Sequence, residues 1–280
     1  MLFGWQENSM AKKTVKKTLQ TLKFTQEPTF AELWDACVHH LLYKVTSYTK
    51  ELETFLRKKS ITKESRIIDV SSGGGFPALQ LLQDGYQVDC MDAFQDEVEL
   101  FQKKAKALGL KTRAVQAYWK EIPKIYPKEA YDLVLCRGNS FIYAGGGWNE
   151  LVKINKRKAL RAYSDTLKDF YRLLKVGGSI YIDKFKDSEK THRETVARLR
   201  IVNRPEQTLI FWTERFPTQK IRRASMIRRD SEGEEQGIPN ITYDLSEFEL
   251  REMMKLVGFK GVKRLHMKGE KHFSILIGQK

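Results

Sequence analysis

The sequence predicts an α/β fold built on a doubly wound, largely parallel sheet, with an N-terminal helical segment and an antiparallel β insertion. Three observations support this fold class. Strand-like and helix-like segments alternate through the middle of the chain, a run of glycines follows the first strand, and consecutive strands replace the alternation in the last third. Strands that alternate with helices of about 10–15 residues are typical of βαβ units and a parallel sheet.

Runs of β-branched and aromatic residues between turn residues predict five strands: residues 66–70, 86–92, 111–117, 131–137 and 179–185. Apolar residues at helical spacing predict three helices between them: residues 79–83, 95–110 and 156–175. The helix at 95–110 has acidic residues in its first turn and lysines later, which complements the helix dipole. Gly177 and Gly178 are expected to close the last helix.

Outside this alternation, helical spacing covers residues 30–56, and strands are expected at 207–216, 219–229 and 238–244. Ser246 and Glu249 form a capping-box pattern for a further helix, and two final strands around "MKGEK" predict a hairpin. The chain thus divides into five parts: a mobile basic N-terminus (1–28), N-terminal helices (29–60), a nucleoside-binding core (61–187), an antiparallel lid (188–245), and a C-terminal helix and strands that complete the core sheet (246–280).

Charge is unevenly distributed. The net charge of +15 divides into +4 for residues 1–60, −1 for 61–150 and +12 for 151–280. A basic surface can attract polyanions, and it can equally serve only to keep the protein in solution; both interpretations stay open here.

The cysteines, the apolar runs and the histidines indicate where the protein is located and whether it binds a metal. The three cysteines lack C-x-x-C spacing and indicate buried thiols in a reducing compartment. We find no apolar run of about 20 residues and no signal-peptide pattern, so a cytoplasmic protein without a membrane span is expected. The five histidines show no metal-binding spacing, so no metal is expected. A homo-oligomer is compatible with the sequence.

The stretch "IIDVSSGGGFP" predicts a nucleoside site. Asp69 ends a strand, and the glycines after it permit positive φ and close backbone approach. A third glycine at dinucleotide spacing is missing, and so is a P-loop lysine. The remaining pattern, D-x-x-x-G-x-G, suits a nucleoside with an amino-acid tail better than one with phosphates.

A second carboxylate supports this interpretation. Asp92 ends the second strand, 19 residues beyond Gly73, where nucleoside-binding parallel sheets place an acid that bonds the ribose hydroxyls. The alternative is that Asp92 only caps the next helix. Tyr118 and Trp119 follow the third strand, near where an adenine would lie, although a tryptophan there can also be a core residue.

Together these segments resemble the class I S-adenosylmethionine-dependent methyltransferases, and "YDLVLCRGNSF" is similar to the glycine and sarcosine N-methyltransferase family. The "AYW" and "SIYID" segments agree, and the resemblance covers about Trp34 to Lys280. It implies a Rossmann-like sheet, S-adenosylmethionine as cofactor and a cofactor site made of the following residues: Asp69, Ser71, Gly73, Gly75, Asp92, Ala93, Tyr118, Trp119 and Arg137, the last through its backbone. Lys44 would stand where the family has an arginine for the methionine carboxylate.

The sequence departs from this family at the acceptor. The arginine that holds the substrate carboxylate corresponds to Phe185, and a nearby tyrosine corresponds to Asp187, which puts glycine as acceptor in doubt. Asn139, Tyr143 and Asp183 are the residues expected to orient the acceptor.

Three functions remain open: methylation of a small amine or amino acid, methylation of RNA or another macromolecule, and cofactor binding without catalysis. The basic cluster "KIRRASMIRR" motivates the second. Alternation along a strand would put Arg222 and Arg228 on one face and Arg223 and Arg229 on the other, which splits the cluster. A small-molecule acceptor is therefore preferred over nucleic acid.

Overall fold

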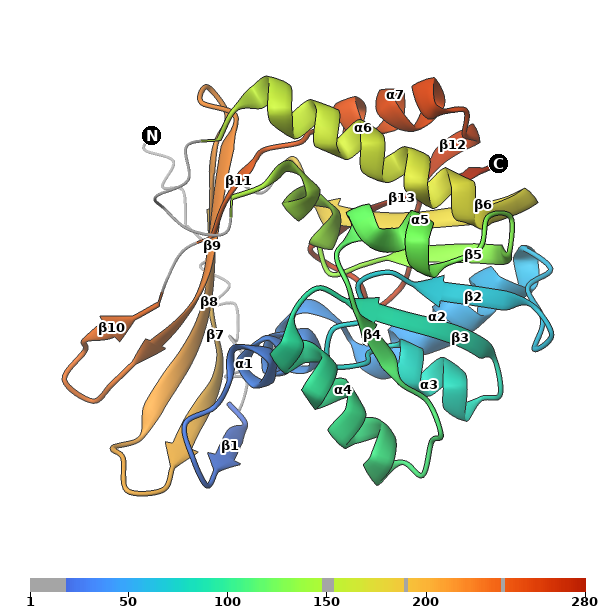
Figure 1. Ribbon diagram of the computed structural model, residues 1–280. Helices are drawn as coiled ribbons and strands as arrows, with labels where there is room; N and C mark the ends of the chain where they lie inside the picture. The colour runs from blue at the N-terminus through green and yellow to red at the C-terminus, as the bar shows by residue number, and fades with distance from the viewer. Residues whose placement is uncertain (1–18, 148–153, 189–190, 238–239) are drawn as a thin grey trace, which may run out of the picture.

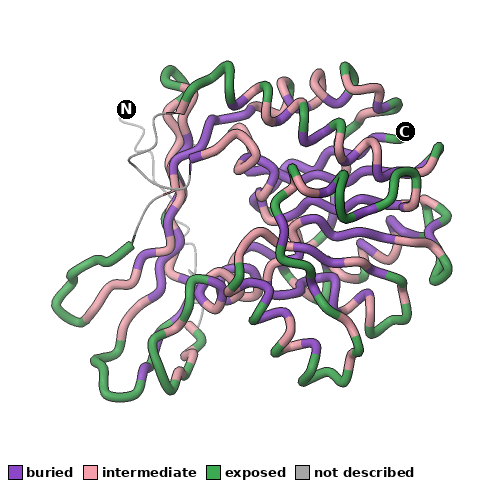
Figure 2. Tube along the Cα trace, in the orientation of Figure 1, coloured by how far each residue is buried: buried purple, intermediate pink, exposed green. Residues whose placement is uncertain are grey.

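The computed structural model describes residues 19–147, 154–188, 191–237 and 240–280. Two sheets organise these residues: a seven-stranded core sheet with helices on both faces, and a second sheet to its left in Figure 1. Figure 2 shows that the buried backbone runs along the strands of both sheets, while the exposed segments are mostly loops and the outer turns of helices. Within the described ranges, no helix is long and apolar enough to cross a membrane.

The core sheet has the strand order β12-β13-β6-β5-β2-β3-β4. The strands from β6 to β4 in this order are all parallel, and the C-terminal hairpin adds two antiparallel strands at one side. The predicted fold class is therefore confirmed. The bounds are β2 (Arg66–Asp69), β3 (Gln87–Asp92), β4 (Ala114–Gln116), β5 (Tyr131–Cys136), β6 (Leu174–Phe185), β12 (Lys260–Leu265) and β13 (Phe273–Gln279).

Helices cover the two faces of this sheet and enclose two separate apolar clusters. Alternation along β2 sends Ile67 into one cluster and Ile68 into the other. The first cluster lies under α1 (Phe30–Cys37), α2 (Val45–Lys58), α3 (Ala78–Gln83) and α4 (Gln95–Ala107). The second lies under α5 (Ile122–Ile125), α6 (Lys156–Leu173) and α7 (Glu247–Val257).

The second sheet, here called the lid sheet, is antiparallel except where its first strand runs parallel to its neighbour. It contains β1 (Thr21–Phe24), β7 (Thr191–Ile201), β8 (Gln207–Phe216), β9 (Ile221–Arg229), β10 (Glu235–Gln236) and β11 (Asn240–Tyr243). Three of these strands differ from expectation. Part of the N-terminus expected to be mobile forms β1, and β10 was not predicted either. β7 was not predicted, because its many charged residues mask the alternation.

The end of α6 also differs from the prediction. The helix ends at Leu173, and β6 begins at the next residue, so Gly177 and Gly178 lie inside the strand instead of closing the helix. A side chain at position 178 would approach the Tyr131 carbonyl oxygen to 3.0 Å. The glycine there fits close packing within the strand and does not terminate the helix.

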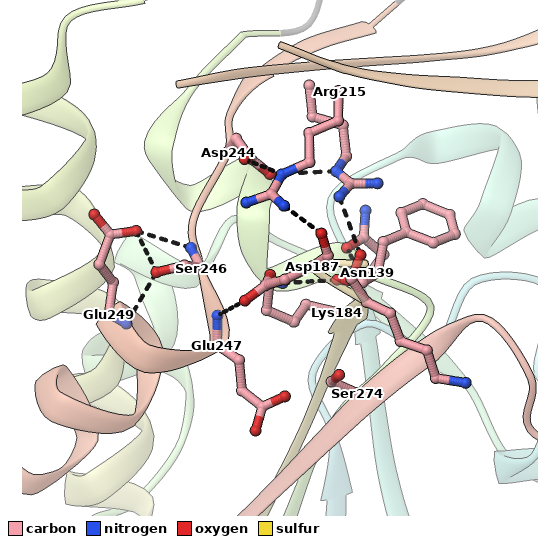
Figure 3. Close-up of polar contacts among 12 residues, drawn as sticks. Asn139, Lys184, Asp187, Arg215, Asp244, Ser246, Glu247, Glu249 and Ser274 are labelled. Atoms are coloured by element: carbon pink, nitrogen blue, oxygen red, sulfur yellow. Dashed lines mark hydrogen bonds and ion pairs between the residues drawn. The ribbon is translucent and has the colours of Figure 1, made fainter. Parts of the chain in front are cut away.

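A polar cluster joins the lid sheet to the core (Figure 3). Asp187, just after β6, accepts from the Lys184 ammonium at 2.5 Å and from the Glu247 backbone N–H at 2.9 Å. Arg215 from β8 donates to the Asp187 carbonyl and pairs with Asp244 at 2.5 Å. Arg222 from β9 reaches the other oxygen of Asp244 at 3.4 Å. The connection from β6 to β7 and the connection from β11 to α7 are thereby held at one place.

Candidate functional site

The glycine turn after β2 is held by its neighbours in the sheet. The Ser71 N–H donates to Asp69 Oδ1 at 3.1 Å, and the Ser71 hydroxyl accepts the Arg137 N–H at 2.9 Å. Gly73 and Gly75 have positive φ values of 48° and 101°. A Cβ at Gly75 would lie 2.4 Å from Leu79 Cδ1, so only glycine fits there.

Two carboxylates lie beside this turn. Asp92 accepts the Gly73 N–H at 2.9 Å and the Phe94 N–H at 3.1 Å. Glu97, in the first turn of α4, is buried next to Gly73, and its Oε2 has no hydrogen-bond partner. Burial raises the pKa of both carboxyls, that of Glu97 well above its usual range. The sequence reasoning missed Glu97, because an acid in a first helical turn was explained by the helix dipole alone.

Aromatic side chains form the next wall. The Trp119 indole N–H donates to the Val70 carbonyl at 2.6 Å, and its ring packs edge-on against Phe170 with centroids 5.7 Å apart. Tyr118 is exposed and lies next to the Lys120 ammonium, 5.4 Å from its ring centroid. Trp119 is thus both packed against the second apolar cluster and part of the cavity wall.

A cavity of about 440 Å³ opens at the carboxyl ends of the parallel strands. The glycine turn and Asp92 line one part of it, and the lid sheet lines another through Phe211, Ser225 and Met226. Of the residues predicted from the sequence, eight line the cavity: Ser71, Gly73, Asp92, Ala93, Tyr118, Trp119, Arg137 and Tyr143. Burial raises the pKa of the Tyr143 hydroxyl to about 12, so it stays protonated at neutral pH.

Lys44 does not reach this cavity. A π-helical turn (Val38–Leu42) separates α1 from α2, and Tyr43 after it is extended. This geometry turns Tyr43 inward, where its hydroxyl donates to Asp183 at 2.9 Å, and leaves Lys44 exposed at the start of α2. The expectation that Lys44 holds the methionine carboxylate is therefore corrected.

Asn139 and Asp183, expected to orient an acceptor, are buried behind the cavity wall. Asn139 has a φ of 62°, donates its N–H to Asp183 at 2.8 Å and accepts the Phe185 N–H at 2.9 Å. They shape the loop after β5 instead of lining the cavity.

Phe185 packs between Phe211 and Phe273 and does not line the cavity either. Asp69 and Gly75 likewise lie just behind the lining.

Three of the four arginines of β9 are paired with carboxylates. Arg222 contacts Asp244, and Arg228 contacts Glu27 at 2.5 Å. Arg229 pairs with Glu235. The alternation of faces predicted for this strand is consistent with these separate partners. Among the residues that the structure describes, no group of three or more histidines, cysteines or acids is placed to hold a metal ion.

The sequence of this chain is similar to that of known methyltransferases. A family model described as a methyltransferase domain matches residues 61–224. The glycine/sarcosine N-methyltransferase of Aphanothece halophytica is 25% identical over 155 residues, 55% of this chain and 52% of that protein. A ubiquinone biosynthesis O-methyltransferase of Rickettsia felis is 27% identical over 99 residues, 35% of each chain. The chain thus spans about half or less of the length of these curated relatives.

Solved structures resemble nearly the whole chain in fold. The methyltransferase CcbJ from Streptomyces caelestis matches with a TM-score of 0.67 at 14% identity, covering 91% of this chain and 98% of that one. The sugar N-methyltransferase KedS8 from a Streptoalloteichus species matches with a TM-score of 0.63 at 13% identity, covering 91% and 95%. At these identities the likeness shows the fold alone.

Proposed function

The chain belongs to the methyltransferase domain family, and from this premise we propose that it transfers the methyl group of S-adenosylmethionine to the nitrogen of a small amine. The observation that carries the proposal is the charge of the cavity. Of the described residues that line it, five are acidic and two are basic: Asp35, Asp92, Glu97, Asp165 and Asp169, against Lys120 and Arg137. Asp35 and Asp165 have lysine partners, and Asp92 and Glu97 lie beside the glycine turn. Asp169 is the acid that remains for the acceptor, and it favours a cationic or neutral acceptor over an anionic one.

The residues around the glycine turn fit the cofactor. Asp69 Oδ2, Glu97 Oε2 and Arg137 Nη2 are buried polar atoms without a hydrogen-bond partner in the described chain. Buried polar groups are normally satisfied, so such atoms next to one turn indicate a polar ligand. Asp92 and Glu97 are the groups proposed to hold the ribose hydroxyls, and Trp119 with Tyr118 the adenine.

The part of the cavity next to the lid sheet is proposed to hold the acceptor. Phe211 and Met226 supply apolar surface there, and Trp34 from α1 adds an aromatic ring. The clamp for an acceptor carboxylate that the family would place at Phe185 is absent from this wall, because that ring packs in the core. An amine without a carboxylate therefore suits this wall better than glycine.

When bound, the cofactor supplies an electrophilic methyl group on a sulfonium. The chain must align the acceptor nitrogen, and alignment of this kind can contribute roughly 7–11 kcal/mol to lowering the barrier. It must also keep the nitrogen deprotonated. Asp169 on α6 lines the cavity, and burial raises the pKa of its carboxyl. We propose that it takes up the proton of the acceptor amine.

A panel of amines tests the proposal. Release of S-adenosylhomocysteine is measured with glycine, sarcosine, carboxylate-free alkyl and aralkyl amines, and the matching alcohols. We expect the carboxylate-free amines to react fastest and the alcohols not to react. Met226→Ala is expected to raise KM for the preferred amine without changing the affinity for S-adenosylhomocysteine. Fastest turnover of glycine or of an alcohol would refute the proposal.

A further inference from the structure

The part of the cavity wall made by the lid sheet and α1 is apolar. Phe211 on β8 and Met226 on β9 are cross-strand partners, and both line the cavity. Ala224 lies two residues before Met226, so alternation puts it on the same face of the sheet. Trp34 on α1 continues this surface, because its ring centroid is 6.3 Å from that of Phe211, with the planes inclined at 50°. These four side chains are here called the apolar wall.

The apolar wall is accessible from the cavity. Trp34 and Met226 are only partly buried, although both pack against the first apolar cluster. Phe30, the first residue of α1, is 48% exposed and also lines the cavity. Apolar side chains at the wall of a cavity gain free energy when a ligand removes them from water. A ligand with an apolar face of its own covers them best.

The polar groups on the lid side of the cavity already have partners. Among the described lid-sheet residues that line it, two have polar side chains, Ser225 and Asn240. The Ser225 hydroxyl donates to the Met226 carbonyl at 3.3 Å, and the Asn240 side chain is hydrogen-bonded to that of Tyr143. Burying a hydroxyl group without a hydrogen bond is unfavourable. This wall therefore does not suit an amino sugar, which would bring several hydroxyl groups to it.

The acid of the acceptor region comes from a different element. Asp169, which remains for the acceptor nitrogen, belongs to α6. Figure 1 shows α6 above and α1 below, both to the right of the lid sheet. The cavity thus offers an acid from α6 and an apolar surface from α1 and the lid sheet, which is the arrangement that an amphipathic amine requires.

We propose that the acceptor is an aralkyl amine, whose aromatic ring lies on the apolar wall while its nitrogen faces Asp169. Aromatic rings favour tilted and offset contacts such as the one between Trp34 and Phe211, and these contacts add to the gain from buried area. The thioether of Met226 also contacts aromatic rings favourably. The inference rests on the proposed methylation of an amine and adds the chemical class of the group that carries it.

Paired compounds separate this inference from the proposed function. Release of S-adenosylhomocysteine is measured with phenethylamine, ethylamine and glucosamine, and with phenethyl alcohol and ethanol as the matching alcohols. We expect kcat/KM for phenethylamine to exceed that for ethylamine at least about 10-fold, the least that one methylene contributes in a hydrophobic pocket. Glucosamine should fall behind phenethylamine by about 5- to 150-fold for each hydroxyl group that is buried unpaired.

The outcomes of this series differ for the two proposals. Equal kcat/KM for phenethylamine and ethylamine, or a higher value for glucosamine, would overturn the aralkyl class and leave methylation of an amine intact. Turnover of the alcohols alone would refute the proposed function and with it the amine. The ratio of phenethyl alcohol to ethanol would then show whether the apolar wall selects the ring.

A binding measurement makes the test independent of turnover. Calorimetry of the protein saturated with S-adenosylhomocysteine compares phenethylamine with ethylamine. We expect phenethylamine to bind at least about 10-fold more tightly. Equal affinities would overturn the inference even if neither amine were methylated.

Variants assign the ring to the apolar wall. Trp34→Leu is expected to lower the preference for phenethylamine over ethylamine about 2- to 12-fold, the value of one aromatic contact, without changing the affinity for S-adenosylhomocysteine. Trp212→Leu is the matched control. Trp212 follows Phe211 in β8, so alternation puts it on the other face of the lid sheet, and it does not line the cavity.

The control is expected to keep the full preference for phenethylamine. Retained affinity for S-adenosylhomocysteine shows that each variant is folded. The inference fails if Trp34→Leu and Trp212→Leu change the preference equally.

Discussion

Asp92 at the end of β3 accepts the backbone N–H of Gly73 at 2.9 Å, so one carboxylate joins the glycine turn to the neighbouring strand. Asp92→Ala removes this tie together with the proposed ribose contact. We expect the free energy of S-adenosylhomocysteine binding to weaken by about 1.5–3 kcal/mol in calorimetry. The control is Glu99→Gln, because Glu99 is exposed on α4, the helix that follows β3. It should leave the affinity for S-adenosylhomocysteine unchanged. An unaltered affinity in Asp92→Ala would remove this residue from the site.

Substitutions at Gly75 and Gly109 distinguish the cost of backbone strain from the cost of a steric clash. Both have positive φ, but a Cβ at Gly75 meets Leu79 at 2.4 Å, whereas nothing lies within 4 Å of one at Gly109. Gly109→Ala should lower the free energy of unfolding by about 1–2 kcal/mol from backbone strain alone. Gly75→Ala adds overpacking of about 1–3 kcal/mol. Chemical denaturation measures both, and equal losses would contradict the predicted clash.

The titration of the Asp69 carboxyl should make the free energy of unfolding depend on pH. Burial raises the pKa of its carboxyl to about 7. The folded state then binds more protons than the unfolded state between about pH 4 and pH 7, so this group makes stability fall as the pH rises through that window. Asp69→Asn removes the penalty and should raise the unfolding free energy of the cofactor-free protein at pH 8 by about 1–4 kcal/mol, with little gain at pH 4. Equal gains at both pH values would show another cause.

Asp244 neutralises two lid-sheet arginines at once. Arg215 and Arg222 both contact it, and its side chain is 1% exposed. Asp244→Ala leaves these cations without their acid, and we expect a loss of about 3–5 kcal/mol in unfolding free energy. The control is Glu206→Ala, which breaks an exposed pair with Arg200 and should cost about 0–1 kcal/mol. Similar losses in the two variants would mean that the buried cluster does not hold the lid sheet.

RNA binding should be weak despite the net charge. The densest arginine cluster, on β9, is divided between Asp244, Glu27 and Glu235 as partners, so it does not form a continuous track for phosphates. We expect only non-specific binding, with Kd about 10⁻⁴–10⁻⁶ M at physiological salt. A filter titration with tRNA and single-stranded RNA measures it. Nanomolar affinity together with methyl incorporation into RNA would favour a macromolecular acceptor instead.

The position of Asp92 beside the glycine turn could be predicted because it depends on strand ends. Asp69 and Cys90 are neighbours in the register of β2 and β3, so Asp92 necessarily emerges at the same edge of the sheet as the glycine turn. That relationship follows from parallel pairing and needs no knowledge of side-chain packing. The sequence was sufficient to place these two segments side by side.

Tertiary packing determined the rest. The helical spacing around Lys44 gave no sign of the π-helical turn that points Tyr43 inward in its place. The direction of the Arg137 side chain depends on Tyr48 from α2, which lies 89 residues away in sequence. The acceptor wall comes from a lid sheet in which β1, β7 and β10 were not predicted. None of these features is encoded in the spacing of neighbouring residues.

The position of β13 has a consequence for biosynthesis. This last strand pairs along its whole length with β6, between β6 and β12. A ribosome therefore releases the glycine turn, the parallel strands and the entire lid sheet before the strand that covers the edge of β6 exists. Until then, that edge offers free backbone groups to any other extended segment. A nascent chain at this stage exposes an unpaired strand edge, and a variant without residues 273–279 would keep that edge exposed.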